Sequence, residues 1–170
     1  MKKTVEQLQK TIQTEVEQVL EEVGKGKMKE GSAYEMERSL FKFLLQLGLQ
    51  ILTLYFLARS QASERKEYRD KSGKKYHYQG ERKRNYDSIF GRVEVSRPYF
   101  YRAGKGGVAP LDAELSLGEE CQSDLLREVS EMLSVVSVYH KSAEILGELF
   151  GLEVWTRRLA ANVEEDAQDV

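Results

Sequence analysis

Two short extended runs separated by a glycine constrain the fold of this chain more than any other feature. The first run covers residues 82–89, the second covers residues 92–101, and Phe90-Gly91 lies between them. Both runs are rich in Tyr, Val, Ile and Phe, which favour strands, and glycine tolerates the positive φ of a tight turn. The pattern predicts a β-hairpin, followed by a glycine-rich turn at residues 103–107.

The second run predicts two different faces, because side chains alternate along a strand. One face is apolar and aromatic and the other is largely charged. Pro98 has no N–H to donate to a ladder, so we expect it at an edge or a bend, which leaves an edge open to a partner. The residues expected on the apolar face are Val93, Val95, Arg97, Tyr99 and Tyr101.

Length and cysteine content limit the class of protein. The chain of 170 residues suffices for one modest domain with a helical extension, but not for a two-domain enzyme. Its one cysteine, Cys121, excludes an internal disulfide and a zinc site built from cysteines alone. The N-terminus has no signal-peptide pattern, so we expect a cytoplasmic protein.

Charge is distributed unevenly along the chain. Residues 65–105 carry 13 Lys and Arg and five Asp and Glu, a net charge of +8, whereas the rest carries 13 and 23, a net charge of −10. A basic block with interleaved tyrosines is typical of a surface that follows phosphates, although a solvated loop is the alternative. Because the cations continue onto the hairpin, we predict contact with double-stranded DNA. The candidate DNA-binding residues in this block are Arg82, Lys83, Arg84, Arg92, Arg97, Arg102 and Lys105.

Two helical patterns precede the basic block. Residues 4–23 repeat apolar side chains at spacings of three and four, which predicts a helix that packs on its own domain or pairs with a second copy. Ser32 and Glu35 form a capping-box pattern that begins a second helix over residues 33–59.

This second helix is apolar enough to suggest a membrane span. A stripe of polar residues argues against that interpretation, because a lipid-facing helix has no use for it. We therefore expect the first helix or another protomer to cover the apolar surplus, and we favour a homodimer over a membrane role. The polar stripe consists of Lys42, Gln46, Gln50 and Thr53.

Residues 61–80 are hydrophilic, and we expect a flexible lead into the sheet with a turn at residues 70–73. Tyr76 and Tyr78 form only a short alternating run. His77 lies here, far in sequence from His140, so neither histidine is assigned a metal or catalytic role.

Three helices are expected after the hairpin. Ser123 is placed to cap the first, residues 141–150 form the second with Gly151 at its end, and residues 156–166 form the third. The last two have the layout of a helix-turn-helix, in which Arg157 and Arg158 are further DNA-binding candidates. Residues 111–170 carry 14 acidic and four basic residues, which opposes DNA contact, and ordinary helix packing explains the pair equally well.

These patterns together predict an α+β fold that is mainly helical. A small antiparallel hairpin or sheet is expected between an N-terminal helical pair and a C-terminal, helix-turn-helix-like subdomain. The corresponding divisions are residues 1–60, a helical oligomerisation arm; residues 61–112, the basic segment and hairpin; and residues 113–170, the helical subdomain.

Several segments in a fixed order resemble the N-terminal region of bacterial insertion-sequence transposases of the Kra family. They are the Leu-rich helix at residues 40–57, the basic segment, SIFGRVEVSRPYFY at residues 88–101, Pro110-Leu-Asp112, and SAEILGELFGLEV at residues 142–154. The resemblance implies an oligomerising region that binds element ends, ahead of a ribonuclease-H-type domain in which three carboxylates hold two metals. Many relatives carry a Cys-x-x-Cys zinc knuckle where this chain has RAGKGG at residues 102–107, so no zinc ligand is expected.

The predicted function is a noncatalytic DNA-binding and oligomerisation module of a transposase, without a cofactor. Acidic residues lie on predicted helices, with no strand series to hold a catalytic triad, and Cys121 and the serines lack a recognisable neighbouring base. Two alternatives remain open. One is a protein-protein interaction domain that does not bind DNA; the other is one part of a split transposase whose catalytic domain is a separate chain.

Overall fold

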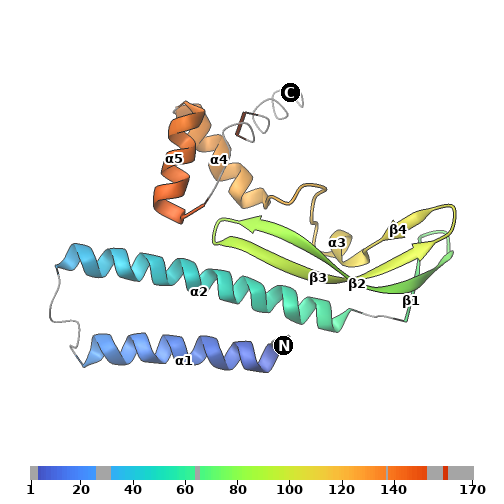
Figure 1. Cartoon of the computed structure of the whole chain (residues 1–170), viewed down its shortest axis with the longest axis horizontal. Helices are drawn as coiled ribbons and strands as arrows, with labels where there is room; N and C mark the ends of the chain where they lie inside the picture. The colour runs from blue at the N-terminus through green and yellow to red at the C-terminus, as the bar shows by residue number, and fades with distance from the viewer. Residues whose placement is uncertain (1–3, 26–31, 64–65, 137, 153–158, 161–170) are drawn as a thin grey trace.

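The computed structural model describes residues 4–25, 32–63, 66–136, 138–152 and 159–160. Within these residues the chain is an α+β protein, which confirms the predicted class (Figure 1). A helical hairpin lies along one side of a long twisted sheet. Two further helices lie near one end of this sheet, and β1 and β4 lie at its other end. The elements are α1 (Val5–Gly24), α2 (Ala33–Ala62), β1 (Glu67–Arg69), β2 (Lys75–Ser88), β3 (Gly91–Arg102), β4 (Gly106–Val108), α3 (Pro110–Glu114), α4 (Asp124–Val136) and α5 (Tyr139–Phe150).

Both N-terminal helices begin at capping boxes. The Thr4 hydroxyl accepts from the Gln7 amide at 3.2 Å, and the Gln7 side chain accepts from the Thr4 amide at 3.0 Å. At α2 the Glu35 carboxylate accepts from the Ser32 amide at 2.7 Å, and this bond lowers the pKa of Glu35 below its ordinary value. Each box satisfies amides that the first helical turn leaves unpaired. The predicted starts of both helices are confirmed.

The sheet is larger than the predicted hairpin. Four strands pair antiparallel in the order β1-β2-β3-β4, and β2 begins at Lys75. The prediction of a flexible lead over residues 61–80 was wrong, because Tyr68 and Tyr76 pair across β1 and β2 and the predicted turn joins these strands. Asp70 closes that turn by accepting from the amides of Ser72 and Lys74, each at 2.9 Å.

The predicted faces of β3 are right near the turn and wrong beyond Arg97. Val93 and Val95 are buried as expected, but Phe100 is buried in place of Tyr101, which is 44% exposed. The change of buried face coincides with a bulge, at which β2 contains one more residue than β3 between the paired positions. Pro98 lies beside this bulge, outside the stretch that pairs with β4, as a residue without an N–H should.

The hydrophobic core joins α2 to the sheet. Phe56 of α2 packs with Val93 and Val95, and its ring lies 5.1 Å from that of Tyr86. At the β2–β3 turn the Phe90 ring covers Gly48, where a Cβ would lie 2.6 Å from the ring. The helical arm predicted for residues 1–60 is therefore anchored to the hairpin along much of α2.

The C-terminal helices are attached at the edge of β2. The Asp87 amide donates to the Cys121 carbonyl at 2.7 Å, and the Ser123 amide donates to the Asp87 carbonyl at 2.8 Å. The Ser123 hydroxyl then accepts from the Leu126 amide at 3.1 Å, which confirms the predicted cap of α4. The predicted end of α5 is also confirmed, because Gly151 has φ +66°. The short helix α3 was not predicted.

The last predicted helix falls mostly outside the described residues. Only residues 159 and 160 are described there, both are helical, and Leu159 is fully buried. Arg157 and Arg158 lie outside the described residues, so the helix-turn-helix arrangement stays a prediction.

Candidate nucleic-acid interface

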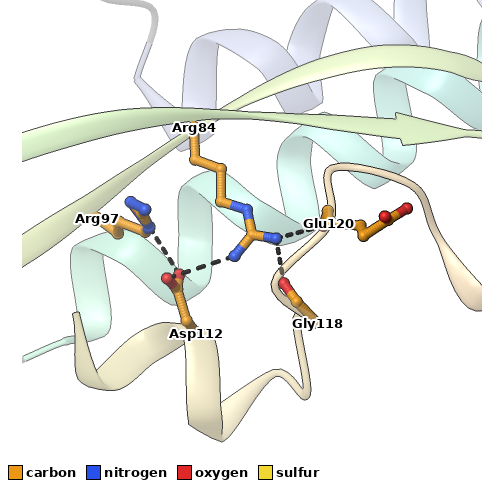
Figure 2. A network of polar contacts seen from close by, with 5 residues as sticks. All are labelled: Arg84, Arg97, Asp112, Gly118 and Glu120. Carbon is orange, nitrogen blue, oxygen red and sulfur yellow. Dashed lines mark hydrogen bonds and ion pairs between the residues drawn. The ribbon is translucent and has the colours of Figure 1, made fainter. Parts of the chain in front are cut away.

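Two of the predicted DNA-binding arginines are bonded inside the protein. Arg97 Nε donates to Asp112 Oδ1 at 2.6 Å, and Arg84 Nη1 lies 3.5 Å from Asp112 Oδ2 (Figure 2). Arg84 also donates through Nη2 to the carbonyl oxygens of Gly118 and Glu120. The two arginine side chains are only 11% and 15% exposed.

This cluster is structural. Arg84 lies on β2, Arg97 on β3 and Asp112 on α3, so the shared carboxylate holds α3 against the sheet. The bonds from Arg84 to two carbonyl oxygens hold the following loop. Charge-assisted bonds of this kind are among the stronger polar contacts when water is largely excluded. We therefore remove Arg84 and Arg97 from the candidate DNA-binding surface, because both side chains are mostly buried and both bind Asp112.

The remaining cations in the middle of the hairpin are exposed but lie beside acids or a ring. Lys83 Nζ is 2.6 Å from Glu94 Oε1, and Arg92 Nε is 2.6 Å from Asp87 Oδ1. The guanidinium of Arg82 stacks 3.6 Å from the centre of the Tyr99 ring. These neighbours offset the positive charge of Lys83 and Arg92, so this region attracts a polyanion less than its sequence suggests.

The far end of the sheet is different. The β1–β2 and β3–β4 turns project from the same end, because Lys75 pairs with Arg69 and Arg102 pairs with Gly106 (Figure 1). We call this surface the basic end. It comprises Arg69, Lys71, Lys74, Lys75, Arg102 and Lys105.

Six cations and two acids give the basic end a net charge of +4. Glu67 is bound to Lys75 at 2.5 Å, and this contact lowers the pKa of Glu67. The second acid is Asp70, whose pKa is lowered first by its bond from the Ser72 side chain and also by the charge of Arg102.

Three lysines at the basic end are available to a ligand. Lys71, Lys74 and Lys105 are exposed, and none has an ion-pair partner among the residues that the structure describes. Tyr101 is half exposed on the same end, opposite the exposed His77. Arg102 lies 5.9 Å above the Tyr76 ring.

Sequence reasoning missed four of these six cations. Arg69, Lys71, Lys74 and Lys75 fell in the supposed flexible lead, so only Arg102 and Lys105 were candidates. The alternation of Lys75, Tyr76, His77 and Tyr78 was the signal for a strand, and the opposite run at residues 67–69 provides its partner.

The described residues contain no group of three or more His, Cys, Asp or Glu that could hold a metal ion. His140 Nε2 lies 3.3 Å from Glu144 on the exposed surface of α5, and Cys121 is part-buried. Comparison with family models, curated proteins and solved structures found no match.

Proposed function

We propose that this chain is a noncatalytic DNA-binding and oligomerisation module of a transposase, and that it binds double-stranded DNA through the basic end. The observation that carries the proposal is a set of exposed lysines at two adjacent turns that have no acidic partner among the described residues, namely Lys71, Lys74 and Lys105. The family resemblance of the ordered segments supports the transposase setting.

Lysines on two turns suit a phosphate backbone. Their flexible stems let the ammonium groups adjust to phosphate positions, and each phosphate they neutralise releases condensed counterions. The neighbouring ring of Tyr101 can pack on a sugar or a base. Contacts of this kind give affinity without sequence preference, so base recognition requires a second surface.

Arg157 and Arg158 are the candidates for that second surface. Both residues lie outside the described part of the chain, and the acidic residues of the C-terminal segment oppose their contact with DNA. Replacing both by Ala tests the assignment. We expect the variant to bind a preferred sequence more weakly than the wild type does, and to bind random duplex equally well. If the variant bound the preferred sequence as tightly as the wild type, the assignment would be rejected.

A protein-protein interaction domain without DNA binding is the second candidate. Exposed apolar side chains on α4 and α5 favour it, namely Met132, Val135 and Leu149. A further possibility is that these side chains contact a separate catalytic chain of a split transposase. In the first case the chain would show no salt-dependent binding to duplex DNA.

A salt titration of duplex binding tests the proposal. The triple variant Lys71→Ala, Lys74→Ala and Lys105→Ala should lower the slope of log affinity against log salt by up to about 3, since each phosphate contact contributes roughly 0.9. The matched control Lys10→Ala, Lys25→Ala and Lys42→Ala removes the same charge from exposed positions on or beside α1 and α2.

We expect the control to bind like the wild type. Equal loss in both triple variants would show that only net charge matters, and an unchanged slope in the first would remove the basic end from the proposal. Absence of any duplex binding by the wild-type chain would favour the protein-protein interaction domain.

A further inference from the structure

Helix α2 presents an apolar face that the described elements cover only in part. The Phe150 ring of α5 lies 6.4 Å from the Phe41 ring, and the Phe90 ring of the β2–β3 turn covers Gly48. Although its 30 residues form the longest described helix, only Phe56 and Ser60 are buried. Five large apolar side chains on it are between 41% and 51% exposed. They are Leu40, Phe41, Leu44, Ile51 and Tyr55, and we call them the α2 stripe.

The other faces of α2 are in use. Leu49, Leu52 and Phe56 pack toward the sheet, and Gln50 Nε2 donates to Glu15 of α1 at 2.7 Å. Gln50 belongs to the polar stripe that the sequence shows, so that stripe lies on the α1 side of the helix. Phe90 borders the α2 stripe at Gly48.

The spacing of the α2 stripe matches a helix-helix seam. Phe41, Leu44, Gly48, Ile51 and Tyr55 follow one another at intervals of three, four, three and four residues. This is the period with which one helix presents a continuous row of side chains to another. The Phe90 ring covers Gly48 in the middle of the row, and because Phe90 is itself 37% exposed it belongs to the same apolar surface.

We infer that the α2 stripe is a homodimer interface in which the α2 helices of two copies pack antiparallel about Gly48. This inference specifies the oligomerisation part of the proposed function and does not depend on DNA binding. The helix that packs on this face belongs to a second copy of the chain, because the row of side chains is nearly symmetric about its centre. Phe41 and Tyr55 each lie seven residues from Gly48, while Leu44 and Ile51 lie four and three residues from it.

Charge complementarity supports the antiparallel arrangement. Glu37 and Arg59 each lie eleven residues from Gly48, on the exposed side of α2. A twofold axis at Gly48 therefore brings Glu37 of one copy near Arg59 of the partner subunit. A parallel pair would place Glu37 beside Glu37, which is unfavourable.

A bilayer fits this helix less well. α2 is long and apolar enough to span one by length and composition, which alone is weak evidence. Its uncharged run covers residues 43–58, and 16 residues rise only about 24 Å, less than the roughly 30 Å of a hydrocarbon core. The sheet and α1 also occupy two sides of the helix, whereas lipid would have to surround it.

The arrangement has a consequence for DNA. The basic end lies near the C-terminal end of α2 (Figure 1), so antiparallel packing sends the two basic ends in opposite directions. Each α2 alone is about 45 Å long at 1.5 Å per residue. The dimer would then hold two separate DNA segments rather than clamp one.

Sedimentation equilibrium of the full chain, without DNA, tests the interface. We expect a dimer for the wild type at micromolar concentration and a monomer for Leu44→Glu with Ile51→Glu, whose dissociation constant should rise at least about 100-fold because four carboxylates would be buried in the seam. Gln46→Glu adds a carboxylate to an exposed position at a different angle around the same helix and should leave the dimer intact. Circular dichroism should show all variants folded, since both stripe residues are half exposed.

Charge reversal tests the direction of packing. Glu37→Arg and Arg59→Glu should each weaken the dimer several-fold, and the two together should restore it. Because Arg59 Nη2 also lies 3.4 Å from Glu114, Glu114→Gln is the control for that internal contact and should not affect the dimer.

Three results would overturn the inference. They are a wild-type monomer at micromolar concentration, a stable dimer of the Leu44→Glu, Ile51→Glu variant, and a charge-reversed pair that remains weak. A monomer that floats with phosphatidylglycerol vesicles, and loses flotation in the double variant, would assign the stripe to lipid. Salt-dependent DNA binding by the monomeric variant would show that the basic end functions independently of the seam.

Discussion

The middle of the hairpin and the basic end of the sheet are both rich in cations, yet their side chains have different surroundings. In the middle, Arg84 and Arg97 share Asp112, and Lys83 is paired with Glu94. At the basic end, Lys71, Lys74 and Lys105 extend from turns without an acidic partner among the described residues. The cations thus hold the fold together in one region, whereas in the other region they remain available to a ligand.

A count of charged residues therefore does not reveal what their side chains bind. Asp112 is separated by 28 residues from Arg84 and by 15 from Arg97, so nothing local in the sequence marks the three as a unit. Lys71, Lys74 and Lys105 remain available because two turns project them beyond the paired strands. Substitutions in the two regions should therefore have different effects. Those in the middle of the hairpin should mainly lower stability, and those at the basic end should mainly lower DNA affinity.

The largest expected effect is on stability, from Asp112→Ala. Removing the carboxylate leaves two mostly buried guanidinium groups without their shared acceptor, and we expect the free energy of unfolding to fall by about 2–4 kcal/mol. The matched control is Glu94→Ala, which breaks an exposed pair and should lower it by less than about 1 kcal/mol. Urea unfolding followed by circular dichroism measures both, and equal losses would show that the cluster is not structural.

Local signals in the sequence predicted much of the helical framework. Ser32 with Glu35, Ser123 before α4 and Gly151 after α5 each act within a few residues of the element they delimit. Their geometry is set by backbone groups close in sequence, so a pattern suffices to find them.

The rest depended on contacts that are distant in sequence. A three-residue strand such as β1 has almost no pattern of its own, and only its pairing with the start of β2 makes it a strand. The exchange of buried faces along β3 occurs opposite a bulge on β2, and no alternation within β3 could reveal that bulge. The sequence could not show, for the same reason, that Arg84 and Arg97 bind an acid from α3. The candidate site therefore lies at the basic end and not in the middle of the hairpin.

DNA affinity should separate the two regions at the level of single residues. Lys74→Ala at the basic end should weaken duplex binding about 5–10-fold at ~0.1 M salt, the loss expected for one phosphate contact. Lys83→Ala, which removes an exposed lysine already paired with Glu94, should change the affinity less than about twofold. Fluorescence anisotropy with a labelled duplex gives both values, and a larger loss for Lys83→Ala would return the interface to the middle of the hairpin.

Arg82, in the middle of the hairpin, distinguishes the effect of charge from that of stacking. Its guanidinium lies over the Tyr99 ring, so Arg82→Ala should lower the free energy of unfolding by about 0.5–1 kcal/mol. Arg82→Lys keeps the charge but loses the planar group, and it should recover little of that stability. Thermal melting measures the stability and anisotropy measures the DNA affinity. If Arg82→Lys restored affinity lost in Arg82→Ala, the residue would belong to the DNA-binding surface.

The smallest expected effect is the titration of Asp70. Bonds from Ser72 and Lys74, with the charge of Arg102, lower the pKa of Asp70 in the folded protein below its ordinary value of 3.8. A carboxyl whose folded pKa is depressed stabilises the fold fully above its unfolded pKa, and that contribution is lost as the pH falls through the folded pKa.

The β1–β2 turn should therefore stay closed until the pH is below 3.8, after which protonation both loosens the turn and removes one negative charge from the basic end. An NMR titration of the Asp70 carboxyl carbon measures the midpoint directly, and Ser72→Ala should move it upward by deleting the strongest of its bonds. A midpoint at or above the ordinary value would mean that the turn donors do not engage the carboxylate, in which case Asp70 would be free to neutralise the adjacent lysines and the contrast with the middle of the hairpin would weaken.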